Sequence, residues 1–221
     1  MKKILLLIGL ATTIVSLSGC LSTLYPLFTE KDLVFEPALL GSWSKTSDNS
    51  VMIFEKSTPP DFKDRPSLQP LANKSYIVTI KENIDDREKT KDHLDDFLIS
   101  RFIACLTRLG NGLYLDMYPV ETPTQKQYNN FYKQHYIGLH SLYRIQIKND
   151  HSFDMGQLKE DYLENLINKK QIRIPYEIGY NGFYIITAST EQLQQYVLKY
   201  GQVPEAYEDD THYEKNAHTK I

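Results

Sequence analysis

Few side chains in this sequence have the type and spacing that acid–base chemistry requires. Asp116 stands within Leu115-Asp116-Met117-Tyr118, where it alternates with apolar residues. On a strand it should therefore point away from the face that those residues share, usually toward solvent. As a general acid it would need a second carboxylate beside it in the fold. Paired across a sheet with Arg108 or Arg144, it would instead be structural.

The histidines do not follow a metal-ligand spacing. His135 and His140 would lie on opposite faces of a strand, His93 stands among Asp92, Asp95 and Asp96, and His212 stands near Asp209, Asp210 and Glu214. We interpret His135 and His140 as surface or packing histidines, and the residues around His93 as a solvated charge cluster. The group around His212 is expected to lie in a mobile tail, which is a poor metal site. The chain has no Gly-x-Ser-x-Gly, His-Glu-x-x-His or P-loop motif. The sequence thus predicts neither a catalytic residue nor a metal site, and assigns no ligand-binding residue.

Cys20 is the residue whose surroundings do indicate chemistry. Met1-Lys2-Lys3 is followed by a nearly unbroken apolar run over Ile4–Val15, and Leu17-Ser18-Gly19-Cys20 ends it. This is the layout of a signal peptide, and the run is shorter than the roughly 20 apolar residues of a transmembrane helix. The closing tetrapeptide resembles the lipobox of bacterial lipoproteins.

That resemblance implies cleavage after residue 19 and acylation of the Cys20 sulfur, with chains such as palmitate. The covalent lipid would be the membrane attachment, and no other cofactor is expected. Leu21, rather than aspartate, follows the cysteine. By the same resemblance, this implies the outer membrane, and no acidic cluster follows that would suggest display on the outer surface. We therefore expect the protein to face the periplasm.

Charge and cysteine content narrow the function class further. Without residues 1–19 the chain would carry a formal charge of -5, and a nucleic-acid partner is not expected at this mild negative value. With Cys20 lipidated, Cys105 would be the one remaining cysteine, so an intramolecular disulfide is excluded. Cys105 lies in the apolar run Phe102–Leu106 without an adjacent histidine, which favours a small buried hydrophobe over a reactive thiol.

The hydrophobic pattern predicts a mainly β (α+β) fold: an antiparallel curled sheet or barrel with two or three packed helices. Its clearest hairpin joins residues 100–109 and 113–118 through Gly110-Asn111-Gly112. Helices are expected over 159–169 and from Ser189 to Gly201, and a strong last strand over 183–188. The same pattern predicts a helical turn near 37–40 and strands at 51–55, 76–81, 140–148 and 153–158. Between them we expect an irregular loop over 57–74, a solvated connection or short exposed helix over 82–96, and aromatic residues at helical spacing in 125–134.

The chain divides into four predicted parts: a leader (1–19), a lipidated cysteine with its tether (20–37), a single globular domain (38–203) and a flexible acidic tail (204–221). The tether is too apolar to be a free linker and should lie on the domain or on the membrane surface.

Leu40-Gly41-Ser42-Trp43 resembles the start of a lipocalin's first strand, where a Gly-x-Trp places the indole across the barrel floor. Leu24–Leu27 and Asp32–Phe35 are similar to segments of uncharacterised bacterial lipoproteins. The lipocalin resemblance implies a domain that binds an apolar or amphipathic ligand. Alternatively, Trp43 is a core anchor beside a tight glycine.

Three functions remain open from the sequence. The first is a non-catalytic envelope lipoprotein that binds a hydrophobic or amphipathic ligand. The second is a scaffolding lipoprotein that holds an envelope protein through exposed tyrosines and charged loops. The third is a hydrolase of unfamiliar geometry, which is expected least because no catalytic motif is present.

Overall fold

A computed structural model describes residues 21–45, 50–83, 97–120, 137–179 and 182–216. Eight antiparallel strands among these residues form a closed barrel, since β6 pairs with β5 on one side and with β7 on the other. The predicted mainly β fold is therefore confirmed, with a closed barrel rather than an open sheet. Closure gives every barrel strand two neighbours and leaves no unpaired edge in the ring.

The barrel strands follow the order β6-β5-β4-β3-β2-β11-β8-β7. Seven of them follow one another along the chain as a meander, and the eighth comes from the C-terminal region. Their bounds are β2 Gly41–Lys45, β3 Val51–Lys56, β4 Tyr76–Asn83, β5 Phe97–Leu109, β6 Gly112–Pro119, β7 His140–Asn149, β8 Ser152–Gln157 and β11 Thr211–Lys215.

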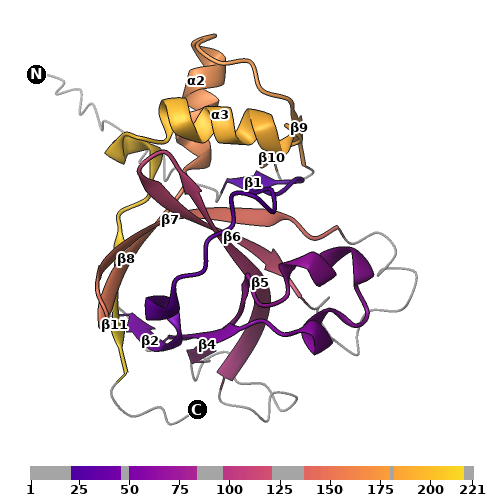
Figure 1. Cartoon of the computed structure of the whole chain (residues 1–221). Helices are drawn as coiled ribbons and strands as arrows, with labels where there is room; N and C mark the ends of the chain where they lie inside the picture. The colour runs from indigo at the N-terminus through magenta and orange to yellow at the C-terminus, as the bar shows by residue number, and fades with distance from the viewer. Residues whose placement is uncertain (1–20, 46–49, 84–96, 121–136, 180–181, 217–221) are drawn as a thin grey trace, which may run out of the picture.

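A smaller layer packs against the outer wall of β5, β6 and β7, where it contacts Leu109, Tyr114 and Leu142 (Figure 1). It contains the helices α2 Glu160–Asn168 and α3 Thr190–Tyr200 and the short strands β1 Ser22–Thr23, β9 Tyr176–Ile178 and β10 Tyr184–Ile186. β1 joins this layer to the barrel because it pairs antiparallel with β7 and parallel with β10. The predicted capping box of α3 is present: Ser189 accepts from the backbone of Gln192, and the Gln192 side chain accepts from the Ser189 backbone.

Large side chains fill the barrel interior at the end next to residues 37–39. Trp43, Phe54 and Phe153 are almost fully buried, and the Phe153 ring meets Trp43 edge-on at 4.8 Å. The indole N–H donates to the Leu39 carbonyl at 2.8 Å, within the short helical turn η1 (Pro37–Leu39) that lies against it. Trp43 is thus a core anchor, and Gly41 beside it has φ +125°, a conformation that favours glycine.

The alternation of side chains along the strands places some of the remaining apolar residues inside the barrel and others on its outer wall. Ala104, Leu106, Leu115 and Met117 from the predicted hairpin face the same interior cluster, as the sequence pattern indicated. On the outer wall, Ile103 and Cys105 pack against Phe62 and Leu71. The last two belong to the turns η2 (Pro59–Phe62) and η3 (Pro66–Leu71), which occupy the stretch predicted to be an irregular loop.

Two expectations need correction. The chain after Glu205 was expected to be a loose tail, but Pro204–Ala206 forms the turn η4, and Thr211–Lys215 is the barrel strand β11 between β2 and β8. The strand expected over 183–188 spans only Tyr184–Ile186 and is not the last. The described part of the predicted tether lies on the domain, one of its two expected positions, since Leu21 and Leu27 are fully buried. Packing against distant strands fixes these polar or short stretches.

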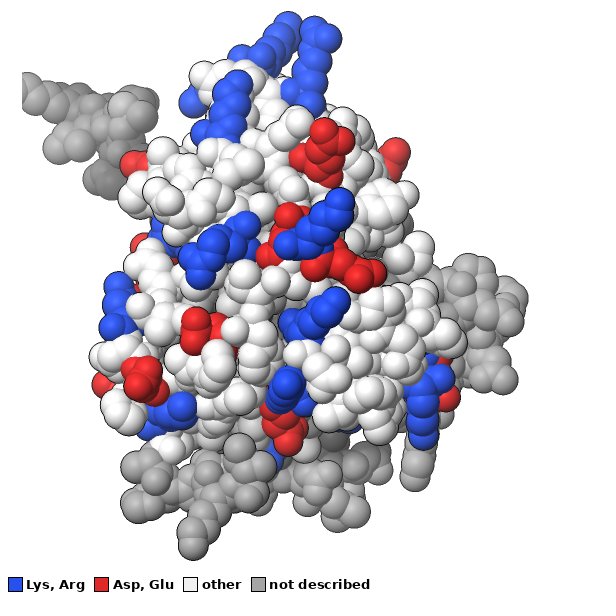
Figure 2. Space-filling view, viewed as in Figure 1, with Lys and Arg blue, Asp and Glu red and all other residues white. Residues whose placement is uncertain are grey.

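Several predicted features lie outside the described residues: the leader with Cys20, the loop centre with His93, the helical spacing of 125–134 and His135. Among the described residues, no helix is both long enough and apolar enough to cross a membrane. On the face shown in Figure 2, acidic and basic side chains are interspersed over the barrel, and basic ones gather at the helical end.

The aromatic packing around Trp43 predicts an uneven sensitivity to mutation. Phe153→Ala should lower the free energy of unfolding by about 3–5 kcal/mol, because it leaves a cavity against Trp43. Phe183→Ala, at a side chain that is 45% exposed, should change it by about 0.5 kcal/mol or less. Urea unfolding followed by circular dichroism measures both. Equal effects of the two substitutions would contradict this account of the core.

Candidate functional site

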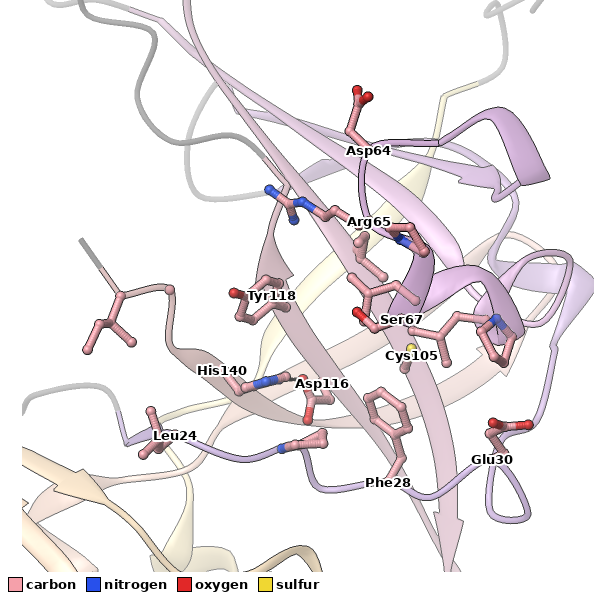
Figure 3. Close-up of a pocket in the computed structure, with 18 residues that line it drawn as sticks. Leu24, Phe28, Glu30, Asp64, Arg65, Ser67, Cys105, Asp116, Tyr118 and His140 are labelled. Carbon is pink, nitrogen blue, oxygen red and sulfur yellow. Dashed lines mark hydrogen bonds and ion pairs between the residues drawn. The ribbon is translucent and has the colours of Figure 1, made fainter. Parts of the chain in front are cut away.

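A groove on the outer wall of the barrel has a volume of about 770 Å³. One side is the extended segment 24–30, the opposite side is η3, and the floor is formed by β5, β6 and the start of β7. Most of its lining is apolar, including Leu24, Phe28, Leu68, Leu71, Ile103 and Ile137. Figure 3 shows Phe28 and η3 on either side of the floor.

Asp116 lies in this floor and is only 1% exposed. The prediction that it points out of the barrel is right, but the prediction that it meets solvent or an arginine is wrong. The segment 24–30 covers it, and its partner is His140, whose Nδ1 lies 2.6 Å from Asp116 Oδ1. Arg144 instead forms an ion pair with Asp210 at 3.1 Å and lies over the Tyr207 ring at 4.0 Å.

The strand register explains why Asp116 and His140 meet. Asp116 pairs with Leu142 on β7, and His140 is two residues earlier on the same strand. Side chains two residues apart share a face, so both project from the outer wall (Figure 3). At the same point β1 pairs with β7, with Thr23 opposite His140. The pair therefore lies where the barrel meets the smaller layer.

Both oxygens of the Asp116 carboxylate accept hydrogen bonds. Oδ2 accepts from the Leu27 backbone N–H at 2.7 Å, while Oδ1 faces His140 Nδ1. A buried carboxylate requires such donors because burial removes its water. With the proton on Nδ1, the neutral imidazole keeps Nε2 as a hydrogen-bond acceptor. The arrangement fixes the tautomer and orientation of a histidine in the groove lining.

The helix α3 helps to hold the groove wall in place. Thr190 Oγ1 donates to the Pro26 carbonyl at 2.7 Å, and Gln194 Nε2 donates to the Leu27 carbonyl at 2.9 Å. Asp32, at the end of this segment, accepts from Thr29 and Gln194. Those hydrogen bonds hold the pKa of the Asp32 carboxyl below its usual range, although partial burial acts in the opposite direction.

An aromatic side chain joins His140 to a cation at the opposite wall. The Tyr118 ring lies 4.8 Å from the His140 ring, and the Arg65 guanidinium carbon is 6.0 Å from the Tyr118 centroid. Arg65 also donates to the carbonyls of Pro119 and Val120, which ties η3 to the end of β6. Polar and aromatic groups thus gather along one line of an otherwise apolar groove.

Cys105 lies next to Asp116 on the neighbouring strand, on the side away from His140. It is a buried free cysteine, as predicted. Burial and the nearby Asp116 carboxylate raise the pKa of its thiol well above the usual range. A thiol in this state is a poor nucleophile, so Cys105 acts as part of the packed wall.

His212 has a different setting from the one predicted. It lies on β11, and its Nδ1 is 2.6 Å from Asp154 Oδ1 on β8. Lys148 Nζ also reaches Asp154, at 2.9 Å. Hydrogen bonds from His212 and Lys148 lower the pKa of the Asp154 carboxyl despite the opposing effect of partial burial. In the described part of the chain, no group of three or more His, Cys, Asp and Glu residues is placed to hold a metal ion.

The sequence identified Asp116 but not its partner. Its alternation with apolar neighbours indicated the outward direction, and His140 was noted only as a packing histidine. A register between β6 and β7 would have brought the two together, but the connection between these strands, residues 120–139, carries no short-turn signal that fixes a register.

Comparisons with known proteins give no independent guide to this site. No family model matches the chain, and the searches of curated proteins and of solved structures returned no match. The geometry of the groove therefore carries the functional argument.

Two aspartates that each contact a histidine at 2.6 Å provide a matched test of burial. Asp116→Ala should lower the free energy of unfolding by about 3–5 kcal/mol, because His140 and the Leu27 N–H lose a buried charged partner. Asp154→Ala, with partners 41% and 46% exposed, should cost about 1 kcal/mol or less. Chemical denaturation at neutral pH measures the difference. A cost for Asp116→Ala no larger than for Asp154→Ala would show that the buried pair does not hold the groove together.

Proposed function

We propose that this chain is an envelope lipoprotein, anchored through lipid on Cys20, whose domain binds a small amphipathic ligand in the outer groove. The observation that carries the proposal is one oriented, buried polar pair, Asp116 and His140, in the floor of an apolar groove of about 770 Å³. Small-molecule sites typically combine apolar walls with a few placed polar groups. The apolar walls would take the hydrocarbon part of the ligand, and His140 would bind its polar group.

The filled barrel favours the groove over the barrel interior as the ligand site. In a lipocalin-like binder the ligand would lie inside the barrel, but here Trp43, Phe54 and Phe153 fill the interior at the end next to η1. The pocket at the opposite mouth has a volume of about 300 Å³, less than half that of the groove. A ligand with a long apolar chain therefore fits the outer wall better.

The position of the groove also suits a ligand that comes from a membrane. Its wall begins at Leu24, four residues after the proposed lipidation site. An extended chain of four residues spans at most about 14 Å. Because Leu21 is buried and its N–H donates to the Leu158 carbonyl, little free chain separates the anchor from the domain. The anchor would hold the groove close to the bilayer surface.

A hydrolase is a second candidate, favoured by the same Asp116–His140 pair. A carboxylate-oriented imidazole is the arrangement by which enzymes activate a hydroxyl, thiol or water. The groove lining contains Cys105, which is buried, and Ser67, which is exposed on η3. Figure 3 shows Ser67 on the η3 side of the groove, apart from His140 on the floor. Ligand binding is therefore the function that the described geometry supports better.

A charge placed in the groove wall should abolish binding. In Leu68→Glu a carboxylate replaces an apolar wall residue, and the affinity for a fluorescent fatty acid should fall by about tenfold or more, since burying the charge is costly. Leu198→Glu, at a half-exposed position on α3 outside the groove lining, is the matched control and should bind as the unmodified chain does. Equilibrium titration of the full chain in detergent measures both. Equal affinities for the two variants would overturn the groove assignment.

The proposed lipid anchor on Cys20 can be tested separately from the groove. Mass spectrometry of the native product should find the chain beginning at residue 20, with acyl chains on that cysteine. Cys20→Ser should release the protein from the membrane fraction, because lipids contribute about 0.8 kcal/mol per buried CH₂ and their loss removes the attachment. An unmodified Cys20 in the native product, or a retained leader, would refute the anchor while leaving the groove experiment valid.

A further inference from the structure

The methionines of the domain gather at a single place. The sequence contains four methionines, and apart from Met1 all of them, Met52, Met117 and Met155, line the pocket at the barrel mouth opposite η1. They come from β6 and β8, which flank β7, and from β3, which lies opposite β7 in the ring. Each side chain is buried and faces the barrel interior, so three thioethers approach the pocket from different sides.

The rim of this pocket has an excess of negative charge. Glu82, Glu208 and Asp209 line it, against the single cation Lys45 among the described lining residues. Oε1 of Glu208 is shielded from solvent and has no hydrogen-bond partner among the described residues. Oε2 of the same carboxylate lies 3.9 Å from Lys159 Nζ, and the Glu208 side chain is 41% exposed. Negative charge at a narrow mouth raises the local concentration of cations.

We propose that the barrel mouth binds one soft monovalent cation, copper(I), through the thioethers of Met52, Met117 and Met155. Thioether sulfur is a soft ligand that selects copper(I) over harder ions such as magnesium or calcium. The pocket volume of about 300 Å³ is ample for one ion, and the acidic rim supplies the charge complementarity. The site is separate from the outer groove and does not depend on the proposed ligand or anchor.

Packing alone is the competing explanation, since methionine fills irregular gaps in cores. Leucine separates the two explanations because it conserves the volume of methionine closely but has no sulfur. Cys105 is also a soft ligand, although it faces the outer wall, in the cluster with Phe62 and Leu71. A Cys20→Ser, Cys105→Ala background therefore excludes both thiols of the chain from the measurement, and the wild-type chain is titrated beside it.

The first experiment measures affinity. The full chain in detergent is titrated anaerobically with copper(I) against a chromophoric chelator, and silver(I) serves as a redox-inert probe. We expect one ion per chain, an affinity about tenfold to a hundredfold weaker after each single Met→Leu substitution, and no binding after all three. Circular dichroism melts confirm that the Leu variants fold. Undiminished binding by the triple Leu variant, or no competition by the unmodified chain, would overturn the proposal.

The second experiment observes the sulfur atoms directly. With ¹³C at the methionine methyl groups, silver(I) should shift the signals of Met52, Met117 and Met155 together, and the shifts should end at one equivalent. Single Leu substitutions assign the three signals and distinguish them from Met1 where the leader is present. Shifts of only one signal, or of none, would show that the three methionines are packing residues.

Discussion

The alternation of side chains along β6 connects the two halves of this structure. Leu115 and Met117 enter the barrel, and Asp116 between them leaves it. Because β6 also closes the ring through β7, this one strand sets both the packing inside and the polar pair outside. A shift of one residue in the β6–β7 register would place the carboxylate in the aromatic interior and the apolar side chains in the groove. The buried charge is thus also a strong constraint on register.

The covering segment turns an outer barrel wall into a site. Asp116 would lie on the surface of a bare barrel, but the segment around Leu27 lies over it and supplies one of its hydrogen-bond donors. Hydrogen bonds from α3 hold the same segment from the other side. The polar pair, the segment and the helix therefore support one another. The proposed anchor at Cys20 would attach to the beginning of this assembly.

The sequence predicted most of the barrel but misread its last strand. Strands with alternating or β-branched residues, such as 76–81 and the hairpin around Gly110-Asn111-Gly112, were recognisable because their signals are local. Thr211–Lys215 carries charged and polar residues, and only Tyr213 is deeply buried. Such a segment has no strong strand signal of its own. It becomes a strand because β2 and β8 present unpaired edges to it.

By itself, the sequence determined the features that depend on neighbours along the chain. These are the period of the strands, the capping box of α3 and the outward direction of Asp116. The tertiary structure decided what depends on segments far apart: the closure of β6 on β7, the meeting of Asp116 with His140 and the three methionines at one mouth. The physical reason is that a strand's period follows from its own residues, whereas its partner and register follow from packing across the whole barrel.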